Sequence, residues 1–157
     1  MNHEREQTIS DDKVFSHLLE IAEKDNSGVS ACIVRKGGIL ASITSFNSGG
    51  VIVHAEQNLL GLLEQKHIKI EEDDVLYTTL EPCSARFDST GGAPDCTTLI
   101  QRAGIRNVVY SACDPIQTII THKRCDVFGI NLRQIDNLEI QEKARGLFNN
   151  LQTGYRL

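Results

Sequence analysis

Two short motifs and one further cysteine place the strongest constraint on how this chain can fold. The tripeptide H-A-E occupies residues 54–56, E-P-C occupies residues 81–83, and the further cysteine is Cys96. One imidazole and two thiolates can hold a zinc ion tetrahedrally and leave its fourth position to water. A fold that uses this set must bring His54, Cys83 and Cys96 to one point.

The apolar residues alternate between helical and strand spacing along the chain. Helical spacing, with Ser10 and Asp95 as N-caps and Gly104 as a stop, predicts helices over residues 11–24, 54–64, 96–103 and 138–151. Strand spacing predicts strands over residues 29–35, 39–46, 74–80, 108–113 and 130–135. We expect a glycine-rich loop at 45–50 and either a loop or a helix before the last strand. The order predicts an α/β fold, a three-layer α/β/α sandwich around a mixed sheet of about five strands.

Length, charge and hydropathy limit the function classes. The 157 residues suffice for one domain with a buried core. We expect a flexible N-terminus over residues 1–10 and a single domain over residues 11–157. No apolar run approaches the roughly 20 residues of a membrane span, and no signal peptide is evident, so we expect a cytoplasmic protein with no membrane partner. The formal net charge of −5 favours a small-molecule substrate over a nucleic acid.

The five cysteines are an odd number, which in a chain without a signal sequence favours metal binding or plain thiols over a disulfide framework. Cys32 and Cys113 lie in apolar runs, and we expect both to be buried strand residues. Cys125 has no motif around it and is interpreted as uninvolved in the chemistry. Cys83 and Cys96 remain as the candidate metal ligands.

The set His54, Glu56, Cys83 and Cys96 is typical of a hydrolytic zinc deaminase. Bound zinc would keep both thiols deprotonated and lower the pKa of water toward 7. Glu56 lies two residues from the histidine and can carry protons as a general acid and base. We therefore expect residues 11–157 to be a single zinc deaminase domain, with Glu56 catalytic and Zn²⁺ as cofactor.

Three alternatives stay open on the residues alone. His54 could simply cap a helix. Cys83 and Cys96 could be unrelated buried thiols or a disulfide pair. A structural zinc site needs four protein ligands, and Asp88 or Asp95 could supply the fourth.

Residues 75–115, with T-L-E-P-C-S, an A-G-I turn, a V-V strand and a D-P pair, resemble the cytidine/deoxycytidylate deaminase superfamily. They are most similar to the pyrimidine deaminase of riboflavin biosynthesis, and the resemblance covers roughly residues 12–151. The chain departs from the superfamily in residues 84–95, which separate the cysteines much further than the common C-x-x-C. It also lacks the usual Asn-Pro pairs at 26–28 and 116–117. These departures bear on the substrate and not on the zinc chemistry.

The resemblance implies substrate contacts at Asn47 and near Ala55, and Arg86 is a candidate phosphate contact. On the residues alone, Asn47 could instead be a turn residue and Arg86 a solvated side chain. It implies removal of an exocyclic amine from a pyrimidine-type ring, with the ribosylaminopyrimidine phosphate of the riboflavin pathway as leading substrate. The alternatives are a cytidine, deoxycytidylate or other nucleobase deaminase, then a tRNA adenosine deaminase, then a non-catalytic binding protein on the same fold. It also implies a homo-oligomer, a dimer or larger.

Overall fold

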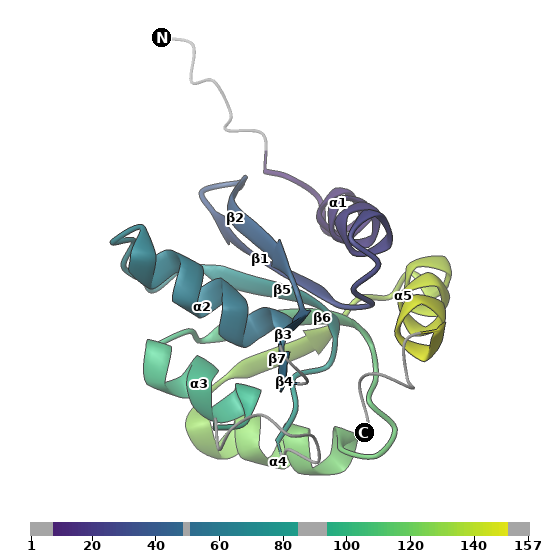
Figure 1. Cartoon of the computed structure of the whole chain (residues 1–157). Helices are drawn as coiled ribbons and strands as arrows, with labels where there is room; N and C mark the ends of the chain where they lie inside the picture. Colours follow the sequence, from purple (N-terminus) through teal and green to yellow (C-terminus); the bar gives the residue numbers. More distant parts are fainter. Residues whose placement is uncertain (1–7, 49–50, 85–93, 151–157) are drawn as a thin grey trace, which may run out of the picture.

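The computed structural model describes residues 8–48, 51–84 and 94–150, and it shows a central sheet between two layers of helices (Figure 1). Helices α1 and α5 pack together on one face of the sheet. Helices α2, α3 and α4 lie on the other face, with α2 next to α3 and α3 next to α4. The α/β/α sandwich predicted from the order of elements is confirmed.

The helices and strands follow the predicted ranges closely. The elements are α1 (Asp11–Lys24), β1 (Ser30–Arg35), β2 (Gly38–Thr44), β3 (Phe46–Ser48), β4 (Val51–Val53), α2 (Ala55–Gln65), β5 (Val75–Leu80), α3 (Cys96–Ala103), β6 (Asn107–Ala112), α4 (Thr118–Phe128), β7 (Asn131–Gln134) and α5 (Leu138–Asn150). No helix in the described parts of the chain is long and apolar enough to cross a membrane. Of the N-terminal segment 1–10, residues 1–7 lie outside the description, so the domain division stays a prediction.

The main sheet is mixed, with strand order β2-β1-β5-β6-β7. β1 pairs antiparallel with β2 and with β5, whereas β5, β6 and β7 run parallel. A tight turn through Lys36 and Gly37, both at positive φ, joins β1 to β2, as a two-residue hairpin requires. β1, β5 and β6 are buried on both faces because helices cover both, and this explains their nearly continuous apolar sequence.

Local capping signals fix the start of α1 and both ends of α3, the helix that begins with Cys96. The Ser10 hydroxyl accepts a hydrogen bond from the Lys13 N–H at the start of α1. The Asp95 carboxylate does the same for the Thr98 N–H at the start of α3, and Gly104 ends that helix at φ 81°. Each residue belongs to a type favoured at its position, which is why these boundaries were predictable.

The loop predicted at 45–50 and the end of the predicted strand 39–46 are wrong in part. β2 ends at Thr44, and Phe46–Ser48 forms a second, two-stranded sheet with Val51–Val53. Residues 51–53 are all β-branched, which favours a strand, and they pair with 46–48. The glycines between the two strands had indicated a loop instead. The segment before β7, expected to be either a loop or a helix, is the helix α4.

The three cysteines outside the candidate site are placed as follows. Cys32 is fully buried in β1, as expected. Cys113 lies one residue beyond β6 and is only partly buried, because the strand ends at Ala112. Cys125 is buried in α4 and is not part of the candidate ligand group.

Candidate active site

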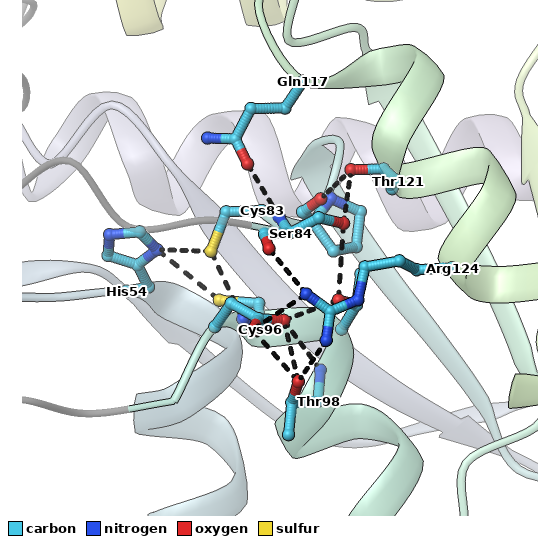
Figure 2. A network of polar contacts seen from close by, with 11 residues as sticks. His54, Cys83, Ser84, Cys96, Thr98, Gln117, Thr121 and Arg124 are labelled. Carbon is cyan, nitrogen blue, oxygen red and sulfur yellow. Dashed lines mark hydrogen bonds and ion pairs between the residues drawn. The ribbon is translucent and has the colours of Figure 1, made fainter.

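His54 stands at the N-cap position of α2 in an extended conformation, but its imidazole makes no capping hydrogen bond. The helix-capping alternative is therefore wrong. The side chain is 9% exposed and points toward the two cysteines (Figure 2).

Cys83 follows the end of β5, and Cys96 is the first residue of α3. The backbone N–H of Cys96 donates to Sγ of Cys83 at 3.2 Å, and the N–H of Thr97 donates to the Cys83 carbonyl at 3.1 Å. The N-terminus of α3 thus holds Cys83, and the N–H of Cys96 together with the dipole of α3 favours a negative charge on that sulfur. Both cysteines are buried and neither forms a disulfide bond, so the disulfide alternative is also wrong.

The three candidate ligand atoms form one compact group. Nδ1 of His54 lies 3.6 Å from Sγ of Cys83 and 3.5 Å from Sγ of Cys96, and all three atoms lie within 4.8 Å of one another. In a tetrahedral zinc site with Zn–S of about 2.3 Å and Zn–N of about 2.0–2.1 Å, nitrogen and sulfur ligands lie about 3.6 Å apart. The two nitrogen–sulfur separations therefore match those of a zinc site.

The surroundings of Cys83 favour its thiolate. The hydrogen bond from Cys96 and the contact with His54 outweigh the opposing effect of burial, and together they lower the pKa of Cys83 to about 6. A thiolate is the form that binds a metal. At neutral pH the site therefore already presents a metal-binding sulfur.

Glu56 lies beside the cluster and is buried. Its Oε2 is 3.5 Å from Sγ of Cys96, and its Oε1 is 2.7 Å from the hydroxyl of Thr78. The same hydroxyl is 3.0 Å from the Leu80 carbonyl oxygen. Thr78 was not anticipated, because a threonine in a buried strand carries no sequence signal that distinguishes it from a packing residue.

A four-ligand structural site finds no support among the described residues. The only group of three or more candidate ligands there is His54, Cys83 and Cys96. The Asp95 carboxylate accepts hydrogen bonds from Thr97 and Thr98 as the cap of α3. Asp88 lies outside the described residues.

The predicted substrate contacts are only partly visible. Ala55 is fully buried as the first residue of α2, adjacent to His54. The backbone of Asn47 lies in β3, but its side chain is outside the description, as is the whole of Arg86. These assignments stay predictions.

Glu81 of the E-P-C motif turns away from the cluster and toward α4. Its Oε2 accepts hydrogen bonds from the Thr118 hydroxyl at 3.0 Å and from Nε2 of His122 at 3.1 Å. No described residue bonds its Oε1, although the side chain is fully buried. The contacts of α4 with the motif were not predicted, because the sequence left this segment unassigned.

Comparison with known proteins agrees with this geometry. Residues 9–112 match the cytidine and deoxycytidylate deaminase zinc-binding region. A diaminohydroxyphosphoribosylamino-pyrimidine deaminase of Buchnera aphidicola (subspecies Schizaphis graminum) is 29% identical over 144 residues, which cover 89% of this chain and 90% of that protein. The riboflavin biosynthesis protein RibD of Aquifex aeolicus is 34% identical over 90 residues, 57% of this chain and 22% of that one.

Among solved structures, a diaminohydroxyphosphoribosylaminopyrimidine deaminase/5-amino-6-(5-phosphoribosylamino)uracil reductase from Thermotoga maritima superposes with a TM-score of 0.71 at 26% identity. The match covers 90% of this chain and 40% of the Thermotoga chain, so this chain spans less than half of that protein. The family match extends over most of the elements that build the site. The chain therefore belongs to the zinc-dependent cytidine and deoxycytidylate deaminase family of aminohydrolases.

Proposed function

We propose that this chain hydrolyses an exocyclic amine from a pyrimidine ring, with zinc held by His54, Cys83 and Cys96. The observation that carries the proposal is the meeting of these three ligand atoms beside one buried carboxylate, Glu56. A purely structural zinc does not need that carboxylate.

The reaction needs a nucleophile and a proton carrier. Zinc, when bound, would lower the pKa of water to about 7 and so supply the nucleophile at neutral pH. Glu56 takes one proton from the attacking water and gives it to the ring nitrogen, and it then takes the second proton from the added hydroxyl and gives it to the leaving amine. A C–O bond forms, the C–N bond breaks, and ammonia leaves, which balances one water against one ammonia. Thr78 orients the Glu56 carboxylate through the 2.7 Å contact.

The substrate that we propose is the ribosylaminopyrimidine phosphate deaminated in riboflavin biosynthesis. Two relatives named for that activity or pathway support it, and one of them matches over 90% of its own length. Asn47 and the backbone around Ala55 would contact the ring or sugar, and Arg86 would contact the phosphate. Cytidine or deoxycytidylate is the second candidate, because the family model includes deaminases of both.

A panel of amines assayed for ammonia release tests this proposal. The panel contains the ribosylaminopyrimidine phosphate, cytidine, deoxycytidylate and a tRNA anticodon stem-loop. We expect the first to be turned over and the others to be inert. Turnover of deoxycytidylate alone would favour the second candidate, and turnover of RNA alone would refute the inference drawn from the negative charge. Zinc binding without ammonia release from any of them would favour a non-catalytic protein.

We propose in addition that the protein acts in the cytoplasm as a dimer or larger oligomer. None of its five cysteines forms a disulfide bond, which suits a reducing compartment. A group of exposed apolar side chains on or just before α4 suits a subunit interface: Ile116, Ile119, Ile120 and Val127. Light scattering of the purified chain gives the subunit number directly, and a monomeric mass would refute the proposed oligomer.

A further inference from the structure

Side chains from α4 and from its N-cap residue, Gln117, hold the backbone on both sides of Cys83. The Thr121 hydroxyl, itself fully buried, donates to the Pro82 carbonyl at 3.0 Å and lies 2.9 Å from the Ser84 hydroxyl. The side-chain oxygen of Gln117 accepts a hydrogen bond from the Ser84 N–H at 2.7 Å. The residues immediately before and after Cys83 are thus fixed by one helix that carries no metal ligand (Figure 2).

Arg124, on the same face of α4, extends this contact to the second cysteine. Its Nη1 donates to the Ser84 carbonyl at 2.8 Å and lies 3.4 Å from Oδ2 of Asp95. Its Nη2 donates to the Thr98 hydroxyl at 3.2 Å, and the guanidinium lies 5.4 Å from the centre of the Phe128 ring. Figure 2 shows the guanidinium between the two cysteine-bearing segments.

Asp95 is the residue that makes this contact relevant to Cys96. It directly precedes Cys96 and caps the helix that Cys96 opens. Its carboxylate accepts hydrogen bonds from the Thr97 hydroxyl at 2.6 Å and from the Thr98 N–H at 3.0 Å. The carboxylate also forms an ion pair with the guanidinium, with Oδ2 lying 3.4 Å from Nη1 of Arg124.

We propose that Arg124 is a positioning residue that sets the separation of the Cys83 and Cys96 thiolates before metal binds. It bridges the residue that follows the first cysteine and the residue that precedes the second. Because the two cysteines are far apart in sequence, bringing them together requires closing a loop, which has an entropic cost. Because Arg124 already holds the two segments together in the folded protein, less loop entropy is lost when zinc binds, and the affinity for zinc is higher. The inference rests on the proposed zinc site.

The planar fork of arginine matters here as well as its charge. A guanidinium can donate to a carbonyl, a carboxylate and a hydroxyl at once, whereas a lysine ammonium is a compact point charge. Removing groups that orient metal ligands typically weakens metal affinity by about 10- to 100-fold. We expect Arg124→Gln to fall in that range and Arg124→Lys to recover only part of the loss.

The test measures zinc affinity by competition with a chromophoric chelator, using purified full-length protein at fixed pH. Arg133→Gln is the matched control. Arg133 lies in β7 and forms an ion pair of 2.9 Å with Asp11 of α1, and neither element carries a cysteine. We expect its zinc affinity to equal that of the wild type. The visible spectrum of bound Co²⁺ reports thiolate coordination independently, and we expect it to change in Arg124→Gln and not in Arg133→Gln.

Zinc affinity of Arg124→Gln within twofold of the wild type would overturn the proposal. Full recovery in Arg124→Lys would overturn the role of the fork. If Arg124→Gln fails to fold, Asp95→Asn tests the same link, because asparagine still caps a helix but lacks the charge; unchanged zinc affinity in that variant would also overturn it. Weakened zinc binding in the variants of a protein that releases no ammonia would leave this inference standing and refute the deaminase. A wild type that binds no zinc would refute both.

Discussion

Replacing Thr78 with valine isolates the contribution of one hydroxyl to the proposed catalytic base. Thr78 is fully buried in β5, and its hydroxyl lies 2.7 Å from Oε1 of Glu56 and 3.0 Å from the Leu80 carbonyl oxygen. Valine has nearly the same shape, so the change removes the donor with little change in packing. The Glu56 carboxylate would keep its place in the sequence but lose the contact that fixes its orientation.

The size of the effect follows from the kind of hydrogen bond lost. A hydrogen bond to a charged group contributes about 1.5–3 kcal/mol. If all of it serves the transition state, kcat falls by about 10- to 150-fold, since 1.36 kcal/mol is tenfold in rate. Glu56 moves protons and does not hold the ground-state substrate, so we expect KM to stay within about twofold.

Thr79 provides a matched control in the next position of the same strand. Its hydroxyl accepts a hydrogen bond from the Ser30 N–H at 3.1 Å, and successive strand side chains point to opposite faces. Thr79→Val therefore removes a buried hydrogen bond without touching Glu56. We expect it to lower the melting temperature and leave kcat unchanged, whereas Thr78→Ser should restore kcat.

The assay is steady-state ammonia release from the proposed substrate, with the zinc content of each variant measured in parallel. A wild-type kcat for Thr78→Val with full zinc content would refute the orienting role. An equal loss in Thr78→Val and Thr79→Val would show that the effect reflects damage to the sheet and not the carboxylate.

Three further predictions concern other parts of the molecule. Glu56→Gln should lower kcat by about 10²- to 10⁴-fold and leave zinc content unchanged in elemental analysis, because general acid–base catalysis contributes that much. Asp74→Asn should lower the free energy of urea unfolding by about 1–3 kcal/mol, because it breaks the paired hydrogen bonds of 2.9 and 2.8 Å from Arg35 to a buried carboxylate. The metal-free protein should melt at higher temperature as the pH rises from about 6 toward 9, because its folded state holds the pKa of Cys83 at about 6 against an ordinary value of 9.0.

Each of these three predictions has a result that would contradict it. Undiminished turnover by Glu56→Gln would refute the catalytic role of that carboxylate. Urea unfolding of Asp74→Asn that matches the wild type would show that the Arg35 pair contributes nothing net. The Cys83 contribution to stability is present in full above pH 9 and lost as the pH falls through about 6. Cys83→Ser should therefore show a flatter pH dependence, and an identical dependence would refute the lowered pKa.

The sequence predicted the parts of the fold that local chemistry determines. Ser10 and Asp95 cap their helices through their own side chains, and Gly104 ends α3 at a positive φ that favours glycine. The candidate metal ligands were also predictable from the sequence, because an imidazole and two thiols at the ends of secondary-structure elements are typical of a zinc site. These features depend on residues close in sequence or on side chains of rare chemistry.

The features that the sequence could not give depend on contacts between distant residues of common types. α4 exposes isoleucines and buries Thr121 and Cys125, so its apolar pattern indicates no helix face. The face of α4 that contacts the site is polar. Its role is evident only from partners some 40 positions away in sequence, such as the Ser84 carbonyl that Arg124 contacts. Thr78 is a similar case, since only the fold places it beside Glu56.

The spacing of the cysteines connects these two kinds of feature. In a C-x-x-C site on a helix, one turn of backbone places both sulfur atoms, since residues three apart are neighbours on the helix surface. Here Cys83 leaves a strand and Cys96 opens a helix, so no single element sets their separation. Tertiary contacts must set it, and the described structure supplies them from α3 through the Cys96 N–H and from α4 through Arg124. Lengthening the connection between the ligands thus transfers the control of metal geometry from local backbone to a neighbouring helix.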